Sequence, residues 1–450
     1  MGAGAGGSGI TRKARGSMCD RGQGVPAMTV LTTEHPLCFL INGDELVKPQ
    51  TSISLAHKAH PHIRMVAERK DENTVNSVVL TAPYSSEGDT TVDYSTPNIC
   101  TRLFSLLKNV RPGSDVTRLQ LPPTFNVPKS LLQCNGESIY CMNQDMLGKC
   151  AEGNSPLERM IRVVAWSIST VRPAHPDAAP LNPILGETHH VSRGTLNVLL
   201  EQVSHHPPVT ALHATDEASK VELVWCQNFL PKFQGTGIET EVHSKRKLYL
   251  LETGECYQMN FPNLMIKLFP VPGCDWAGNV KIKCKETGLE AELCYKPNSL
   301  FSFGSNKRSI KGKIIESSSS KVLYEVSGHW DRTVTIKDTT NGKVKVIYDA
   351  SQVIFGLRAP TLKNEEEVSP SESATVWADV CRAIITKDWD KAREAKTKIE
   401  QKERELVKTR NANGEMWSAK HFNTSYSKKN GWDCSPKSKY VSPAPIIYSA

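Results

Sequence analysis

The chain has 450 residues, of which 39% are apolar and 23% are charged, and its formal net charge is +8. This length is ample for a large hydrophobic core, and the composition is that of an ordinary globular protein. The small basic excess suits an acidic ligand or an anionic membrane surface and is too weak to indicate a nucleic-acid partner.

Cysteine spacing and the length of the apolar runs help to exclude zinc-binding, secreted and membrane-spanning proteins. The 13 cysteines are scattered and include no C-x-x-C pair, which argues against a structural zinc site. The sequence shows neither a secretory leader nor an apolar run of about 18 residues, the length that a membrane-spanning helix needs. We therefore expect a reduced, cytoplasmic protein that contacts membranes only peripherally.

Ordered structure is expected to begin near residue 96. Residues 1–95 start with MGAGAGGSG and lack regular apolar periodicity, so we expect a disordered or loosely docked arm. Residues 96–111, in TPNICTRLFSLLKNVRPG, predict a short helix with one apolar face. That face consists of Ile99, Leu103, Leu106, Leu107 and Val110. The simplest interpretation is core packing; a membrane-surface helix and a lid over an apolar cavity are the alternatives.

The middle of the chain changes from helical to strand periodicity. Residues 140–172 are expected to be helical, with Ser155 as the N-cap of their clearest part. From about 195 to 350, short runs rich in Val, Ile, Leu and Tyr recur roughly every ten residues. Asn341-Gly342 between two alternating runs predicts a β-hairpin. Such a series of antiparallel strands favours a sandwich or a barrel, and a barrel this large leaves room for a ligand tunnel.

Helical periodicity returns after residue 369. Ser369-Pro370-Ser371-Glu372 has the pattern of a capping box, and a long, charged helix is expected to follow to about residue 410. Lys396, Glu400 and Arg404 share one face of that helix, which could hold a phosphate, although such charges are common on solvated helices. Residues 426–450 are expected to form a flexible tail.

Two adjacent histidines occur in EQVSHHPP, residues 201–208. Neighbouring strand residues point to opposite faces, so His205 and His206 can meet one ligand only where a strand ends. Pro207 and Pro208 indicate such an end, because neither can donate to a hydrogen-bonded ladder. Two imidazoles there could bind one phosphate, bind a metal, or be ordinary surface histidines.

A second histidine pair leaves a metal site as an alternative. APLNPILGETHHVSRG places His189 and His190 upstream, so that residues 187–206 contain four histidines and two glutamates. A metal-dependent hydrolase is therefore an alternative to test. Against it, the sequence has no H-E-x-x-H motif, no G-x-S-x-G elbow and no Walker A loop.

EQVSHHPP resembles, residue for residue, the signature octapeptide of the oxysterol-binding protein family. The similarity extends over about 100–425 and includes PGSDVTRLQLPPTF, LNPILGE, PKFQGT, SIKGKI, SGHWD and WSAKHF. NVRPGSD and NPILGETHHVSRG look most like the plant branch, whose members often have a lone lipid-binding domain. The resemblance implies a mainly β (α+β) fold, in which a nearly complete antiparallel β-barrel encloses a hydrophobic tunnel closed by an N-terminal lid.

The resemblance also implies a division of the chain and a set of site residues. The lipid-transfer domain is expected at 96–425, with the lid at 96–111, the barrel at about 180–355 and a C-terminal helical part at about 369–412. The implied phosphoinositide headgroup site consists of His205, His206, Lys396, Glu400, Arg404, Leu181 and Asn182.

One position departs from the family pattern. The family usually has a lysine before the P-x-N-P turn, and this chain has Ala179. The headgroup site therefore lacks one cation, and Arg193 and Lys311 are the candidates to replace it.

By resemblance, the expected function is non-enzymatic exchange of a sterol, phosphatidylinositol 4-phosphate or another phospholipid between membranes. A lipid-regulated sensor or scaffold with the same fold is the alternative. No cofactor, metal or nucleic acid is expected, and the protein is expected to be a monomer at the endoplasmic reticulum and a partner organelle. The sequence has no clear motif for docking to a membrane-anchored receptor.

Overall fold

The computed structural model describes residues 77–83, 99–174, 178–268, 273–297 and 308–449. The chain divides into two compact units, Met1–Asp71 and Glu72–Ala450, and every described residue belongs to the second. The arm expected at 1–95 therefore lies outside the described residues, apart from 77–83. In that short segment Val78 is buried, and the Val79 N–H donates to the Ala374 carbonyl.

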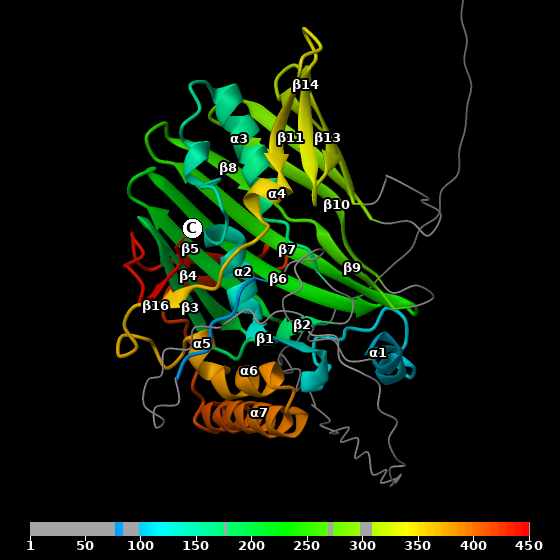
Figure 1. Cartoon of the computed structure of the whole chain (residues 1–450), viewed down its shortest axis with the longest axis vertical. Coiled ribbons are helices and arrows are strands. Elements are labelled where there is room, and N and C mark those ends of the chain that lie inside the picture. The colour runs from blue at the N-terminus through cyan, green and yellow to red at the C-terminus, as the bar shows by residue number, and fades with distance from the viewer. Residues whose placement is uncertain (1–76, 84–98, 175–177, 269–272, 298–307, 450) are drawn as a thin grey trace, which may run out of the picture. The chain divides into compact units, whose positions relative to one another are not determined.

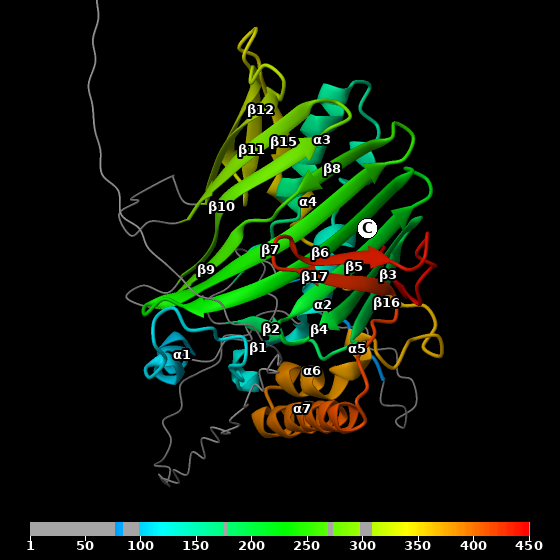
Figure 2. The same ribbon diagram turned by 180° about the vertical axis from the view of Figure 1, so that it is seen from behind.

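One sheet of 15 strands dominates the second unit (Figures 1 and 2). Its order is β15-β14-β13-β12-β11-β10-β8-β7-β6-β5-β4-β3-β19-β16, and β9 pairs with β7 and β10. The β3–β19 pair is parallel, and the other pairs are antiparallel. The mainly β class expected from the sequence is confirmed. Closure into a barrel is not shown, because among the described strands no pairing joins β15 to β16.

The strands of this sheet are β3 Thr188–Arg193, β4 Leu196–Ser204, β5 Val209–Asp216, β6 Val221–Phe233, β7 Gly237–Leu250, β8 Glu255–Met259, β9 Asn263–Lys267, β10 Gly273–Cys284, β11 Leu289–Lys296, β12 Ser309–Glu316, β13 Val322–His329, β14 Thr333–Asp338, β15 Val344–Asp349, β16 Thr361–Leu362 and β19 Ile446–Ile447. Two small sheets consist of β1 Asn126–Ser130 with β2 Ala179–Leu181, and of β17 Phe422–Ser427 with β18 Gly431–Pro436.

The helices are α1 Ile99–Leu107, α2 Leu131–Tyr140, α3 Pro156–Ser169, α4 Ala350–Val353, α5 Ser373–Val376, α6 Ala378–Ile385 and α7 Trp389–Ala412, with 3-10 turns at Pro123–Phe125 and Gly148–Cys150. Within the described residues, no helix is long and apolar enough to cross a membrane.

The hairpin predicted at Asn341-Gly342 is confirmed by the pairing of β14 with β15. Gly342 has a φ of +71°, a left-handed conformation that glycine adopts without strain. Val334 of β14 is buried, whereas Val344 at the start of the edge strand β15 is 64% exposed.

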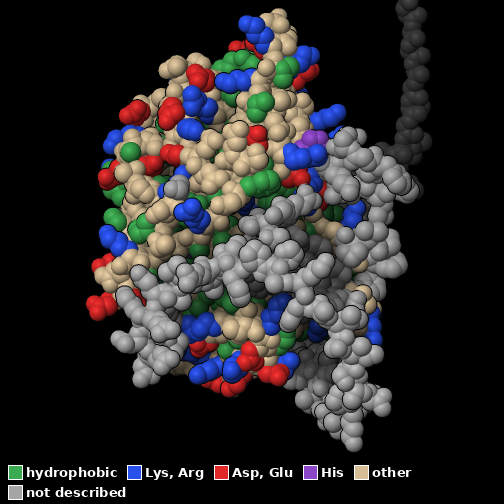
Figure 3. All heavy atoms as spheres, viewed as in Figure 1, with side chains coloured by type: hydrophobic (Ala, Val, Ile, Leu, Met, Phe, Trp, Pro, Cys, Tyr) green, Lys and Arg blue, Asp and Glu red, His purple; other side chains and the backbone are tan. Residues whose placement is uncertain are grey.

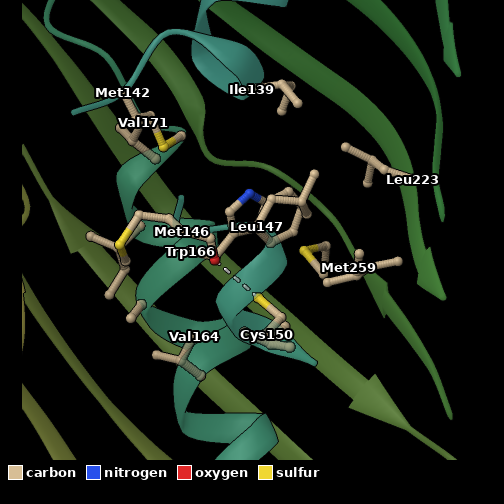
Figure 4. Close-up of a cluster of buried hydrophobic side chains, with 14 of the residues drawn as sticks. Ile139, Met142, Met146, Leu147, Cys150, Val164, Trp166, Val171, Leu223 and Met259 are labelled. Carbon is tan, nitrogen blue, oxygen red and sulfur yellow. Dashed lines mark hydrogen bonds between the residues drawn. The ribbon is translucent and has the colours of Figure 1, made fainter. Parts of the chain in front are cut away.

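Helices α2 and α3 pack on one face of the large sheet, which we call the inner face (Figure 1). Figure 4 shows part of this cluster: Trp166 of α3 and Cys150 of the preceding 3-10 turn lie on the side of Met259 of β8 and Leu223 of β6, whereas Val164 points to the other side of α3. The Ser155 hydroxyl accepts from the Glu158 N–H, as expected of the N-cap of α3. Of the helix predicted at 140–172, the part at α3 is confirmed, whereas residues 141–155 contain only the 3-10 turn at Gly148–Cys150, and α2 ends where the predicted range begins.

Helices α5, α6 and α7 lie at one end of the sheet (Figure 1). They share a second apolar cluster that contains Leu181, Trp377, Val380, Ile384 and Ala392. Charged side chains of both signs mix along this end in Figure 3, where α7 runs, so most of that helix is solvated. The helix expected at Pro370 begins instead at Ser373, because the Glu372 carboxylate binds His189 and the His190 N–H.

Residues after 421 are integrated into the fold, where the sequence predicts a flexible tail over 426–450. The β17–β18 hairpin covers the outer face of β4, β5 and β6, opposite the inner face (Figure 2). Strand β19 then inserts between β3 and β16, and Ile446 is fully buried. Local composition did not indicate that this segment is ordered, because the strands with which it packs and pairs lie far away in the sequence.

Candidate functional site

His205 and His206 lie on the turn that joins β4 to β5, the strand end that the prolines predict. Their ring centroids are 4.6 Å apart, with an interplanar angle of 56°. His205 Nδ1 donates a hydrogen bond of 2.9 Å to the Pro183 carbonyl oxygen, while His206 is exposed. The turn therefore brings both imidazoles to one edge and leaves the His205 Nε2 free of a described protein partner, available to a ligand.

The LNP turn at 181–183 is beside this pair. Strand β2 reaches the turn after pairing with β1 in parallel, and Leu181 is fully buried in the α6–α7 cluster. Asn182, the next residue, is exposed. The buried leucine anchors the turn, so that the Asn182 side chain faces solvent beside Pro183, whose carbonyl oxygen accepts from His205.

Hydrogen bonds of the Asn126 side chain connect Lys396 of α7 with β2, the strand that leads into the LNP turn. The Lys396 Nζ donates to the Asn126 Oδ1 at 2.9 Å and to the Leu121 carbonyl oxygen at 2.5 Å. Asn126 Nδ2 donates in turn to the Ala179 carbonyl oxygen at 3.2 Å. A continuous set of contacts thus runs from α7 through β1 and β2 to the histidine pair.

Glu400 lies between Lys396 and Arg404 on one face of α7. Its carboxylate oxygens are 4.0 Å from Lys396 Nζ and 4.0 Å from Arg404 Nη1. The side chain of Lys396 is 10% exposed and that of Arg404 is 51% exposed. The stripe predicted from i+4 spacing therefore forms, with its buried end toward the LNP turn and its solvated end away from it.

Burial sets the protonation of the site. It lowers the pKa of His205, opposed by the bond to Pro183, and partial burial together with the charges of His205 and Arg118 lowers the pKa of His206. Burial also lowers the pKa of Lys396, opposed by Glu400. Without an anion the two imidazoles are neutral at neutral pH, and a bound phosphate would favour their charged forms.

Sequence reasoning missed Arg118 and Asn126. Both lie in the stretch PGSDVTRLQLPPTF or directly after it, which was noted only as a similarity. Arg118 is exposed and its charge acts on His206, where it adds a cation to a site that lacks one at Ala179. No local pattern marks these residues, because their partners are 53 to 270 positions away in the sequence.

The two candidates to replace the missing lysine lie elsewhere. The Arg193 guanidinium is 5.9 Å from the Tyr448 ring centroid, and its Nη1 donates to the Tyr140 carbonyl oxygen at 3.4 Å. Lys311 is on β12, opposite Cys294 of β11, and six strands separate β12 from β4 in the sheet order. Neither side chain belongs to the headgroup site.

The two histidine pairs do not converge. His189 Nδ1 is 2.6 Å from Glu372 Oε1, and its Nε2 is 3.1 Å from the Tyr140 hydroxyl. His190 Nε2 donates to the Ser442 carbonyl oxygen at 2.8 Å. Across the described ranges, no three His, Cys, Asp or Glu side chains are arranged to hold a metal ion.

The apolar face predicted for 96–111 is divided in the structure. Leu107 is fully buried and Leu103 nearly so, against Phe125, Phe233 and Leu268. Val110 packs partly on the same cluster, Leu106 is 38% exposed, and the Ile99 side chain lies outside the described residues. α1 therefore rests on the ends of β6 and β9, as a packing element or a docked lid would.

A cavity of about 490 Å³ lies on the outer face, between β3–β5 and the C-terminal segment. Its lining includes His190, His213, Lys420, His421 and Tyr440. None of the predicted headgroup residues lines it, so it is separate from the site at the LNP turn.

Comparison with known proteins gives consistent matches. A family model described as oxysterol-binding protein matches residues 102–443. Oxysterol-binding protein-related protein 4C of Arabidopsis thaliana is 51% identical over 373 residues, which cover 82% of this chain and 98% of that protein. The related protein 4A of the same plant is 49% identical over 381 residues, with coverages of 84% and 98%.

Solved structures share the fold at lower identity. The ORD domain of Osh1 in complex with cholesterol has a TM-score of 0.64 at 22% identity and covers 81% of this chain and 90% of that one. The Osh3 ORD in complex with PI(4)P from Saccharomyces cerevisiae has a TM-score of 0.59 at 23% identity, with coverages of 82% and 94%.

A large, mostly antiparallel sheet with two helices on its inner face, and a turn at one strand end that carries two adjacent imidazoles, define a mainly β domain with the fold of these solved structures. The chain belongs to the oxysterol-binding protein family.

Proposed function

We propose that this protein carries lipids between membranes, one molecule at a time and without making or breaking covalent bonds. Two proteins of the same fold were solved with cholesterol and with PI(4)P. The observation that supports the proposal best is the connected set of contacts between Lys396, Asn126, β2 and His205, because it joins the cation of a distant helix to the histidine turn.

The headgroup of phosphatidylinositol 4-phosphate is proposed to bind at this turn. His205 and His206 would donate to the 4-phosphate, and Lys396 and Arg404 would neutralise its remaining charge. Leu181 and Asn182 would present backbone and amide groups to the phosphodiester. Glu400 forms ion pairs of 4.0 Å with Lys396 and Arg404 and would keep the two cations aligned between binding events.

The acyl chains or a sterol are proposed to lie against the inner face, in a tunnel closed by residues 96–111. Apolar surface removed from water contributes roughly 25 cal/mol per Å², which is sufficient to hold a sterol without polar contacts along its length. Residues 96–111 would leave to release the lipid and return afterwards. Both ligands would use one interior, so each would displace the other and a phosphoinositide gradient could drive sterol movement.

The proposed setting is the cytoplasm, as a monomer that touches anionic membranes of the endoplasmic reticulum and a partner organelle. Surface charge supports such contacts, since the chain carries a net charge of +8. No membrane receptor is assigned.

Transfer between two vesicle populations tests the proposal. Donor vesicles carry a fluorescent sterol, and acceptor vesicles carry phosphatidylinositol 4-phosphate or an equal amount of phosphatidylserine. We expect the protein to accelerate sterol transfer, and to do so more strongly toward phosphoinositide acceptors. Binding of both lipids without acceleration would indicate a sensor or scaffold instead, and binding of neither would remove the proposal.

A further inference from the structure

A charged side chain is buried on the inner face of the sheet, away from the headgroup site. Arg246 of β7 is 3% exposed. Its guanidinium carbon is 4.2 Å from the Trp225 ring centroid and 3.8 Å from that of Phe261. Its Nη1 donates to Thr170 Oγ1 at 3.2 Å, and its Nη2 donates to Gln227 Oε1 at 3.0 Å. The two rings and the two hydrogen bonds fix the position of the guanidinium.

This cation has no anionic partner within the described residues. Both of its hydrogen bonds go to neutral oxygens, and no described carboxylate forms an ion pair with it. Burial lowers the pKa of Arg246 to about 9, opposed by Tyr295, so the guanidinium remains charged at neutral pH. An uncompensated buried charge is strongly unfavourable, which means that an anion is expected beside it in the functional state.

The surrounding polar atoms are donors without acceptors. Arg246 Nε, Trp225 Nε1, Ser244 Oγ and Tyr295 Oη are buried, and none of them has a hydrogen-bond partner among the residues that the structure describes. Arginine and indole nitrogens only donate, and hydroxyl groups can rotate to donate. A ligand that is rich in acceptor oxygens would satisfy all four, whereas a single neutral hydroxyl would leave the charge uncompensated.

A row of neutral polar residues adjoins the arginine across four strands. Gln202, Thr210, Gln227 and Ser244 are register partners on β4 to β7, and each is at most 9% exposed. Thr210 Oγ1 donates to Gln202 Oε1 at 2.8 Å, so these two residues already satisfy one another. Within this row, the unmet hydrogen-bonding capacity lies at Ser244, two residues from Arg246 on the same strand.

We propose that Arg246 is the counter-charge for an amphiphile with a small anionic head, a carboxylate or a sulfate, which enters the inner face with that head first. The inference rests on the proposed lipid carriage and narrows the class of cargo. Trp225 and Phe261 would flank the head, and the apolar cluster behind them would hold the tail. The headgroup site at the LNP turn has no part in this mode of binding.

Competition between matched lipids tests the proposal on the full chain. The protein is incubated with equal amounts of cholesterol and cholesterol sulfate, or of oleyl alcohol and oleate, and the lipids bound after re-isolation are quantified by mass spectrometry. We expect the wild type to retain the anionic member of at least one pair at least tenfold over its neutral partner. The pair that shows the preference identifies a steroid or an acyl skeleton.

Substitutions on one strand provide the control. Arg246→Met keeps the length of the side chain without the charge and is expected to reduce the preference to about twofold or less. Lys247→Met removes a cation from the opposite face of β7 and should retain the tenfold preference. If Arg246→Met does not fold, the wild-type ratio decides alone.

A wild-type preference below twofold, or an unchanged preference in folded Arg246→Met, would overturn the proposal and leave an arginine solvated by buried water. In both cases the wild type still binds the neutral lipids, so lipid carriage stands. Binding of no lipid at all would contradict the inference and the proposed function together.

Discussion

The imidazoles of His205 and His206 share one turn but not one environment, since His205 is held by the Pro183 carbonyl and His206 is exposed. We expect His205→Ala combined with His206→Ala to abolish extraction of phosphatidylinositol 4-phosphate from liposomes while sterol binding stays within about threefold, because each charge-assisted bond lost costs about 1.5–3 kcal/mol. His243→Ala, which alters an exposed histidine on β7, is the control. Equal loss of both lipids in a folded double variant would contradict the site.

The lowered histidine pKa values predict a pH dependence. The free imidazoles are neutral at pH 7, and a phosphate favours their protonated forms, so binding should take up protons. As pH falls from 8 toward 6, protonation becomes easier and affinity should rise. Calorimetry in buffers of different ionisation enthalpy measures the uptake, which should disappear in the double variant. Affinity that is independent of pH would show that the histidines do not contact the phosphate as cations.

Glu187 is buried and joins the end of β1, the turn before β3 and the helices α5 and α6 through hydrogen bonds. Its buried carboxylate accepts from Ser130, from Ser373 Oγ at 2.7 Å, from Trp377 Nε1 at 2.8 Å and from the Ile184 N–H at 3.0 Å. Glu187→Ala would leave these donors unpaired. We expect the free energy of unfolding to fall by about 3 kcal/mol or more, measured by chemical denaturation. A loss below about 1 kcal/mol would mean that water replaces the carboxylate.

Among the described side chains of helix α1, Leu103 and Leu107 are buried and the others are exposed. Leu103 and Leu107 pack on Phe125 and Phe233, whereas Leu106 is exposed. We expect deletion of 96–111 to raise the dissociation rate of a bound fluorescent sterol at least fivefold, because it uncovers the ends of β6 and β9. Leu106→Ser is the control and should leave the rate unchanged. An unchanged rate in the deletion variant would make α1 a packing element only.

Local patterns predicted local structure well. The Asn341-Gly342 hairpin, the Ser155 cap and the shared face of Lys396, Glu400 and Arg404 all depend on residues within one turn or one hairpin. The start of α5 was predicted three residues too early, because the glutamate of the expected capping box binds a histidine of β3 instead. The contact between Glu372 and His189, which are far apart in the sequence, therefore prevents the capping box that the local pattern predicts.

Contacts between distant parts of the chain were not predictable from pattern. Asn126 connects β2 with α7 across 270 residues, and nothing in its neighbourhood distinguishes it from other asparagines. The same holds for Arg246, which lies in a strand whose charged neighbours, Lys245 and Lys247, face the other way. The headgroup residues themselves came from family resemblance, since spacing alone left phosphate, metal and surface roles open.

The C-terminal strand is a structural part of the large sheet. Val441, Ala444, Ile446 and Tyr448 are buried, although they belong to a segment of polar composition. We expect truncation after residue 440 to lower the free energy of unfolding by about 4 kcal/mol and to promote self-association, because it removes apolar contacts and leaves β3 without its neighbour. Thermal unfolding with light scattering measures both effects. A truncated chain that melts like the full chain would show that β19 is dispensable.

The place of β19 between β3 and β16 also affects biosynthesis. Strand β3 is translated more than 250 residues before its partner Ile446, so a nascent polypeptide exposes that edge throughout elongation. Exposed strand edges recruit other strands. Chaperones that shield β-rich intermediates are therefore expected to remain associated until translation of residues 446–447 is complete, and stalled ribosomes would yield aggregation-prone products.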